Sequence, residues 1–150
     1  MTNEQVKKLI DICFQAKKIT EQMPELPERI KPRHIHVIAC IAESGDRPAQ
    51  VSSISADLKI TMPSVTKLVF ELEDMQLVRK SALDEDKRAT VLTLTEKGNE
   101  YYQTYVRDYH GHLCDELSFL DNKDCETMIN VINALYDAVE RVSKGEYHHE

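Results

Sequence analysis

The chain has 150 residues, of which 41% are hydrophobic and 30% charged, and its formal net charge at pH 7 is −7. Its longest uninterrupted apolar run, Val37–Ala42, is too short to cross a membrane, and the first residues, MTNEQVKK, contain no apolar signal segment. Composition therefore favours one helix-rich domain in the cytoplasm, without a membrane partner, and the acidic charge argues against indiscriminate binding to nucleic acid.

Two helices are predicted before the clearest motif of the chain. Residues 4–20 repeat apolar side chains at helical spacing, and Pro24 and Pro27 end that helix. The second helix is expected to begin at Pro32, a favourable first-turn residue, and to end at Gly45, a natural C-cap.

A helix-turn-helix pattern follows. We expect Ser52 to cap its first helix and Thr61 to cap its second helix. In the second helix an inward stripe recurs at i, i+3/i+4 and i+7: Val65, Leu68, Val69, Leu72 and Met75. The outward face of the first turns then presents Pro63, Ser64, Thr66 and Lys67. Small polar and basic side chains on such a helix fit the major groove of DNA.

A β-hairpin with a charged tip comes next, with strands near Leu77–Leu83 and Ala89–Leu94 and the polar tip DEDKR. Together with the two helices it predicts a winged helix-turn-helix. Residues 45–93 contain seven Lys and Arg against eight Asp and Glu, so the excess acidity lies mostly outside this segment. Its basic residues on or beside the expected DNA face are Lys67, Arg79, Lys80, Lys87 and Arg88.

The C-terminal part predicts two further helices, one capped by Thr95 and reaching Leu120, the other capped by Asp121. The last helix carries a near-heptad apolar stripe: Cys125, Met128, Ile129, Ile132, Leu135, Tyr136, Val139 and Val142. One chain would leave this stripe and the apolar face of the first helix in water, which marks an interface. We expect residues 32–98 to form the winged helix-turn-helix part and residues 4–22 and 99–143 a homodimerisation lobe, all within one unit; packing of these helices within one chain is the alternative.

The sequence resembles the MarR (multiple antibiotic resistance regulator) family of bacterial transcription regulators at Ile54, Leu58, Ile60 and Thr61, and through SVTKLVFELEDMQLV, DEDKR and LTLTEKG. The order of the predicted helices also matches, so the resemblance covers nearly the whole chain. Lys59 and Gln76 stand where the family usually has Gly, and Ser55 stands where Ala is usual. Non-Gly residues at such turns carry a steric cost of about 1 kcal/mol. The resemblance implies a mainly α fold with a small β-hairpin wing.

The wing has a residue that the resemblance assigns to DNA. Arg88 looks like the family's wing arginine, which enters the minor groove, where a narrow A·T-rich segment attracts it electrostatically. Asp86 beside it would hold the guanidinium, and Lys87 and Arg79 would add positive charge. An ordinary surface ion pair at the tip is the alternative.

Histidines and cysteines suggest a second site. His34 and His36 lie on the second helix, which lines the effector cavity in the MarR family, and His110 and Cys114 share one face of the long helix at i, i+4. These four residues are a candidate Zn²⁺ site, whereas His34, His36, Tyr109 and His110 are candidates for an organic effector pocket. Packed or surface histidines are the alternative.

The four cysteines lie in predicted helices without CxxC spacing, so reduced thiols are expected instead of disulfides. Cys13 followed by Phe14 resembles the reactive pair of the family's organic-hydroperoxide sensors. Those sensors polarise the thiolate with tyrosines on the second helix, and this chain has none there. We therefore expect Cys13 to be a small core residue.

These features predict a DNA-binding transcription regulator, a repressor that binds a pseudo-palindromic operator in double-stranded DNA as a homodimer and responds to a small effector. No cofactor is required, and small aromatic acids are the family expectation for the effector. The alternatives are a zinc- or redox-responsive sensor of the same family and a protein-interaction adaptor that does not bind DNA. The chain lacks GxGxxG, P-loop and nucleophile-elbow motifs, so an enzyme is not expected.

Overall fold

The computed structural model describes residues 1–82 and 90–146. The chain divides into two compact units, Met1–His110 and Gly111–Glu150. In chain order the elements are α1 (Asn3–Glu21), α2 (Pro32–Ala42), α3 (Val51–Leu58), α4 (Met62–Asp74), β1 (Val78–Ala82), β2 (Thr90–Leu94), α5 (Glu96–Tyr102), the π-helical segment η1 (Gln103–Asp108), α6 (Tyr109–Glu116) and α7 (Asn122–Ser143). The predicted mainly α fold with a β-hairpin wing is confirmed.

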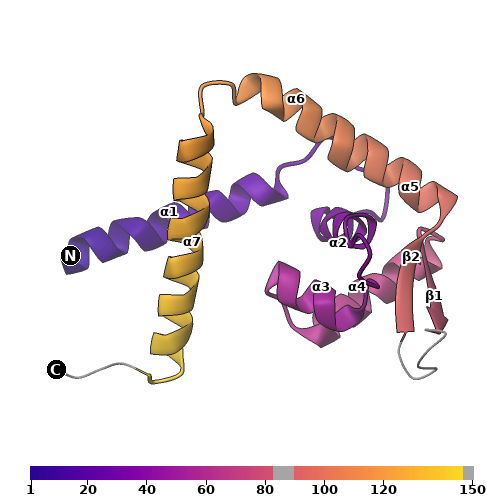
Figure 1. Cartoon of the computed structure of the whole chain (residues 1–150), viewed down its shortest axis with the longest axis horizontal. Coiled ribbons are helices and arrows are strands. Elements are labelled where there is room, and N and C mark those ends of the chain that lie inside the picture. The colour runs from indigo at the N-terminus through magenta and orange to yellow at the C-terminus, as the bar shows by residue number, and fades with distance from the viewer. Residues whose placement is uncertain (83–89, 147–150) are drawn as a thin grey trace. The chain divides into compact units, whose positions relative to one another are not determined.

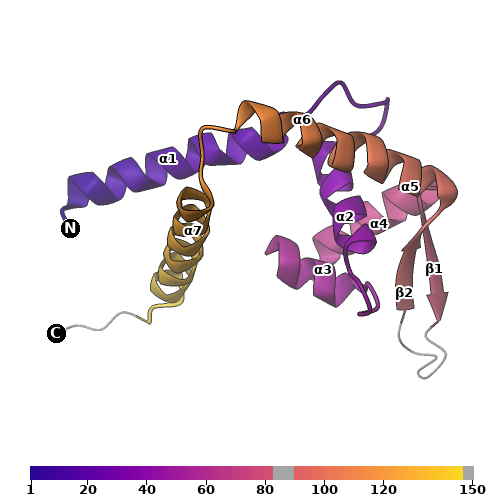
Figure 2. The same ribbon diagram turned by 45° about the horizontal axis from the view of Figure 1, so that its top comes forward.

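The core of the first unit lies where α2, α3 and α4 meet the hairpin and α5, as Figures 1 and 2 show. Its buried apolar side chains are Ile35, Val37, Ile38, Ile41, Ala49, Ile54, Val65, Leu68, Val69, Leu72, Leu77, Val78, Leu92 and Val106. The inward stripe predicted for α4 is therefore confirmed at its four central members, and Met75 packs against this core while partly exposed.

The hairpin pairs β1 and β2 antiparallel, from Val78 opposite Leu94 to Ala82 opposite Thr90. The N–H of Leu92 donates to the carbonyl of Ala49 at 2.8 Å, which ties β2 to the turn before α3. The wing is thus attached to the helix-turn-helix by a backbone hydrogen bond and by the buried side chain of Leu92.

The two turns that depart from the family pattern both use left-handed backbone. Lys59 ends α3 at φ 51° and Gln76 follows α4 at φ 60°, the region that favours glycine. Ser55, the other departure, donates its hydroxyl to the carbonyl of Ile60 at 2.6 Å, and Thr95 donates to the carbonyl of Gln76 at 2.7 Å. These bonds hold each turn in the conformation that its side chain disfavours.

Two predicted boundaries in the first half of the chain are wrong. Gln50 caps α3, because its N–H donates to the Ser53 hydroxyl at 3.0 Å, so Ser52 is not the cap. Helix α2 ends at Ala42, where the hydroxyl of Ser44 bonds the carbonyl of Ile41; Gly45 lies in the following turn.

The long helix also differs from its prediction. Its middle, Gln103–Asp108, has π-helical hydrogen bonding, and its end is Glu116 instead of Leu120. The N–H of Leu120 donates to the carbonyl of Leu117 at 2.9 Å, which closes a separate turn before α7. Thr95 and Asp121 cap α5 and α7 as predicted.

The terminal helices α1 and α7 contain no buried residue. Both expose large apolar side chains; α1 exposes Val6, Leu9, Ile10, Ile12, Phe14 and Ile19, and α7 exposes Met128, Ile129, Val131, Ile132, Tyr136, Val139 and Val142. Within residues 1–82 and 90–146, no helix is both long enough and apolar enough to span a bilayer. The assignment of residues 4–22 and 99–143 to one dimerisation lobe remains a prediction.

Candidate DNA-binding surface

Helix α4 begins as its sequence predicts. The Thr61 hydroxyl accepts the N–H of Ser64 at 3.4 Å and contacts the Ser64 hydroxyl at 2.9 Å, and Pro63 occupies the first turn, where its missing N–H costs nothing. Ser64 is half-buried and is engaged in this cap. Of the four residues predicted to face the groove, Pro63, Thr66 and Lys67 are exposed.

The wing residues fall into two groups. Arg79 and Lys80 are exposed on β1, and the Lys80 ammonium lies 2.8 Å from the Glu73 carboxylate. Asp86, Lys87 and Arg88 lie outside the described residues, so their predicted contacts with DNA stay predictions.

Sequence reasoning missed Phe70 on this surface. Its side chain is 66% exposed on α4, and Met62 at the start of the same helix is 54% exposed. Phe70 lies three and four residues after Lys67 and Thr66, so helical spacing places it on their face. That spacing was available in the sequence, but the prediction stopped after the first turns of the helix.

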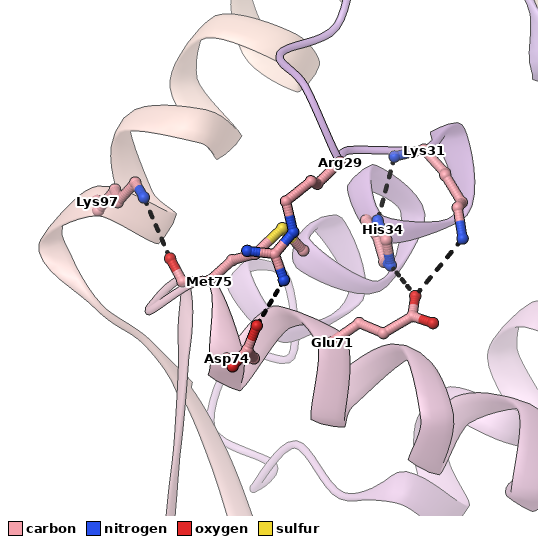
Figure 3. A network of polar contacts seen from close by, with 7 residues as sticks. All are labelled: Arg29, Lys31, His34, Glu71, Asp74, Met75 and Lys97. Atoms are coloured by element: carbon pink, nitrogen blue, oxygen red, sulfur yellow. Dashed lines mark hydrogen bonds and ion pairs between the residues drawn. The ribbon is translucent and has the colours of Figure 1, made fainter.

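The C-terminal half of α4 carries three carboxylates that would repel DNA phosphates if they were free. Each is paired with a group from another element: Glu71 with His34 and Lys31, Glu73 with Lys80, and Asp74 with Arg29. Figure 3 shows the Glu71 and Asp74 pairs converging from the segment before and at the start of α2 onto α4. The ammonium of Lys97 also donates to the carbonyl of Met75 at the end of α4. These contacts offset the acidity of this half of the helix and hold its end in place.

His34 is at the centre of this network. Its side chain is 1% exposed; its Nδ1 accepts the N–H of Lys31 at 3.1 Å, and its Nε2 lies 2.7 Å from Glu71 Oε2. Because Nδ1 accepts, the proton belongs on Nε2, which donates to the carboxylate. The hydrogen bond from His34, helped by the charge of Lys31, lowers the pKa of Glu71. His34 therefore joins α2 to α4 with both ring nitrogens occupied.

Replacing Glu71 by Gln is expected to lower the free energy of unfolding at pH 7 by about 1 kcal/mol, because the hydrogen bond to His34 loses its charged partner. The pKa of Glu71 is lowered from its ordinary value of 4.5. Its contribution is thus complete above that value and is lost as the pH falls through the lower pKa of the folded state. The difference between parent and variant should therefore shrink as the pH falls below 4.5 and through the lowered pKa of Glu71.

Urea unfolding of both chains between pH 3.5 and 7 measures this difference. Glu73→Gln is the matched control, since it removes a charge from the same helix and the partner of Glu73, Lys80, is at the surface. It should lower the free energy of unfolding by about 0–1 kcal/mol, towards the low end. A difference between parent and Glu71→Gln that grows towards acid pH would contradict the assignment.

A separate cavity of about 280 Å³ lies within the first unit, between α1, α2 and the end of α3. Its lining residues are Lys17, Thr20, Glu21, Pro32, Arg33, His36, Leu58 and Ile60. His36 is thus the one predicted effector residue in this lining, and its Nε2 lies 3.2 Å from the carbonyl of Thr20. Tyr109 instead donates its hydroxyl to the carbonyl of Gln22, and His110 lies beside the Tyr109 ring.

The metal candidates do not form a cluster in the described residues, where no group of three or more His, Cys, Asp or Glu side chains could hold an ion. His34 is occupied by Lys31 and Glu71. His110 and Cys114 both lie on α6, but no third His, Cys, Asp or Glu of the described residues joins them. Burial raises the pKa of the Cys40 thiol to about 11, so this cysteine is a poor nucleophile at neutral pH.

Residues 30–90 match the sequence model of the MarR family. Two relatives from Bacillus subtilis (strain 168) are each 24% identical: the HTH-type transcriptional regulator MhqR, over 84% of this chain and 87% of its own length, and the HTH-type transcriptional repressor MdtR, over 94% and 92%.

Solved structures share the fold. A MarR/EmrR family transcriptional regulator from Acinetobacter sp. ADP1 aligns with a TM-score of 0.74 at 19% identity, covering 93% of this chain and 99% of that one. S. aureus MepR in complex with DNA aligns at 0.67 and 18% identity, covering 92% and 96%. The PcaV transcriptional regulator from Streptomyces coelicolor in complex with its natural ligand aligns at 0.63 and 18% identity, covering 87% and 91%.

Proposed function

Because the chain belongs to the MarR family, we propose that it represses transcription as a homodimer on a pseudo-palindromic operator and that a small effector changes its affinity for DNA. Members of this family are DNA-binding transcription regulators and not enzymes. The MepR complex with DNA supports the same use of this fold here, and the repressor MdtR supports the direction of regulation. The proposed location is the cytoplasm, with the DNA.

The observation that carries the DNA-binding proposal is the exposed face of α4. Pro63, Thr66 and Lys67 project from a helix whose opposite stripe is buried in the core. The carboxylates further along the helix are paired, and Lys67 and Arg79 place exposed positive charge on the surface. A helix so presented, beside a β-hairpin, has the geometry of a recognition helix in the major groove.

The homodimer is proposed from α1 and α7. An amphipathic helix with no buried residue leaves its apolar stripe in water unless a partner covers it. A twofold axis would pair the same helices of two chains and set two copies of α4 about one DNA turn apart, which suits a pseudo-palindrome.

The effector is proposed to occupy the cavity between α1, α2 and α3. Leu58, Ile60 and Pro32 supply apolar lining, while Lys17, Arg33 and His36 supply positive or donor groups, a combination suited to a small aromatic acid. The PcaV complex with its natural ligand supports ligand control in this fold. The alternative is zinc or redox sensing. Zinc sensing would be favoured if small aromatic acids left the affinity for DNA unchanged and zinc changed it.

DNA binding is tested by fluorescence anisotropy with a duplex from the chain's own promoter region. Affinity should fall with salt at a slope of about −0.9 per phosphate contact, and Lys67→Ala should reduce that slope by about one contact if Lys67 meets a phosphate. Arg88→Ala should weaken binding by about 1–3 kcal/mol, mostly on sites with A·T-rich flanks.

Lys144→Ala is the control, because Lys144 lies at the end of α7 and pairs with Glu140. It should bind as the parent does. Equal affinity of Arg88→Ala and the parent would contradict the assignment of the wing. A parent chain that binds no promoter duplex at low salt would overturn the proposed DNA binding and favour the alternative of a protein-interaction adaptor.

A further inference from the structure

Phe70 is an aromatic side chain exposed on α4, a helix that buries most of its apolar residues. Val65, Leu68, Val69 and Leu72 of α4 are all in the core, yet Phe70 is 66% exposed. An exposed phenylalanine at this position adds apolar area beside Pro63 and Thr66 on a surface that otherwise offers polar and cationic groups. No packing role in the described core accounts for it.

Its position is set by the helix. Pro63, Thr66, Lys67 and Phe70 follow one another at i, i+3, i+4 and i+7, so they share one stripe. With a rise of 1.5 Å per residue, the stripe is about 10 Å long, roughly the length of three stacked base pairs. Phe70 therefore extends the surface that Pro63 and Lys67 begin.

The stripe has little capacity to read bases by hydrogen bonds. It contains no Arg, Asn or Gln, whose planar groups bond two atoms of one base; its one candidate for such a contact is Lys67, and Ser64 beside it is already engaged by Thr61. What the stripe does present is apolar surface, from Phe70, Pro63 and the methyl group of Thr66. In the major groove the matching apolar group is the 5-methyl of thymine.

The charge of the surface around Phe70 favours DNA over a protein as its binding partner. Glu71, Glu73 and Asp74, the nearest carboxylates in the sequence, are all paired with groups from other elements. Lys67 lies one turn before Phe70 on the same stripe and suits a phosphate backbone at the edges of the groove.

We propose that Phe70 is a specificity-determining residue that packs against the 5-methyl group of a thymine in the major groove of the operator. This inference rests on the proposed function and goes further by naming the base and the contact. It makes sequence preference depend on thymine methyl groups and gives Lys67 the task of positioning the helix on the backbone.

The test uses the full chain and a promoter duplex in which single thymines are replaced by uracil. This change removes only the methyl group and leaves the hydrogen-bonding edge intact. At one thymine in each half-site the parent should lose about fourfold in affinity per methyl. Phe70→Ala should bind the thymine duplex more weakly by at least that factor and should not distinguish thymine from uracil there.

Two controls separate this contact from general effects. Lys144→Ala, which removes a side chain at the end of α7 that pairs with Glu140, should retain the parent's preference for thymine. Phe70→Leu should keep part of that preference. Light scattering and the melting midpoint of Phe70→Ala should match those of the parent, because the side chain is exposed.

The proposal is overturned if Phe70→Ala binds as tightly as the parent, or if it still discriminates between thymine and uracil at every position. Both results leave the proposed DNA-binding function standing, since the parent binds. Loss of the dimer in Phe70→Ala would instead identify a second copy of the chain as the occupant. A parent that binds no duplex overturns the proposed function, and this inference with it.

Discussion

Gly98→Ala is expected to lower the free energy of unfolding by about 3 kcal/mol or more, the largest loss expected from a Gly to Ala change at any of the four glycines. A Cβ at Gly98 would lie 2.0 Å from the carbonyl oxygen of Leu77 and 3.3 Å from the Cβ of Leu94. The obstructing atom belongs to the backbone and already accepts the N–H of Thr95 at 3.1 Å. It cannot rotate away as a side chain would.

To relieve this steric overlap, α5 would have to move away from the hairpin. The N–H of Gly98 donates to the Thr95 hydroxyl that caps α5, so the shift would also weaken this cap. The gain in helix propensity from Gly to Ala, about 1 kcal/mol, is smaller than the free-energy cost of this steric overlap.

Urea unfolding followed by circular dichroism measures the loss. Gly111→Ala is the matched control, because Gly111 lies in α6 and a Cβ there has nothing within 4 Å. It should stabilise the chain by about 0.5–1 kcal/mol. Equal stability of Gly98→Ala and the parent would contradict the close contact between α5 and the residue before β1.

Ile132→Glu is expected to convert the proposed homodimer into a monomer at micromolar concentration. Ile132 is 41% exposed in the single chain and lies in the middle of the apolar stripe of α7. In a dimer a carboxylate at this position would be desolvated without a partner, which costs several kcal/mol, or at least about 100-fold in affinity. DNA affinity should fall as well, because two half-sites could no longer be bound together.

Light scattering with size exclusion distinguishes the 17.3 kDa chain from a particle of twice that mass. Asn130→Glu is the control, since it adds the same charge to α7 on the side opposite Ile132. It should remain dimeric. A parent chain that elutes as a monomer at micromolar concentration would contradict the homodimer outright.

Local pattern was sufficient for the recognition helix and for most helix starts. The inward stripe of Val65, Leu68, Val69 and Leu72 and the cap at Thr61 depend on residues three or four apart, and the structure confirms them. Helix ends were less well predicted. Gly45 is a good C-cap, yet α2 ends earlier because Ser44 bonds the carbonyl of Ile41.

The roles of the histidines illustrate the limit of local pattern. In the sequence His34 and His36 look alike as effector or metal residues. The fold brings Glu71, 37 positions away, against His34 and leaves His36 in the lining of a cavity. Two side chains two positions apart point to different sides of a helix, but the groups that each side chain contacts depend on the packing of the whole chain.

The sequence by itself thus determined which helices form, which face of α4 is buried and where the wing lies, because short-range periodicity and capping are properties of neighbouring residues. Only the tertiary structure decided that Asp74 and Glu71 are paired by Arg29 and His34, and that Gly98 has no room for a methyl group. Each depends on the distance between segments far apart in the chain, which no local pattern contains.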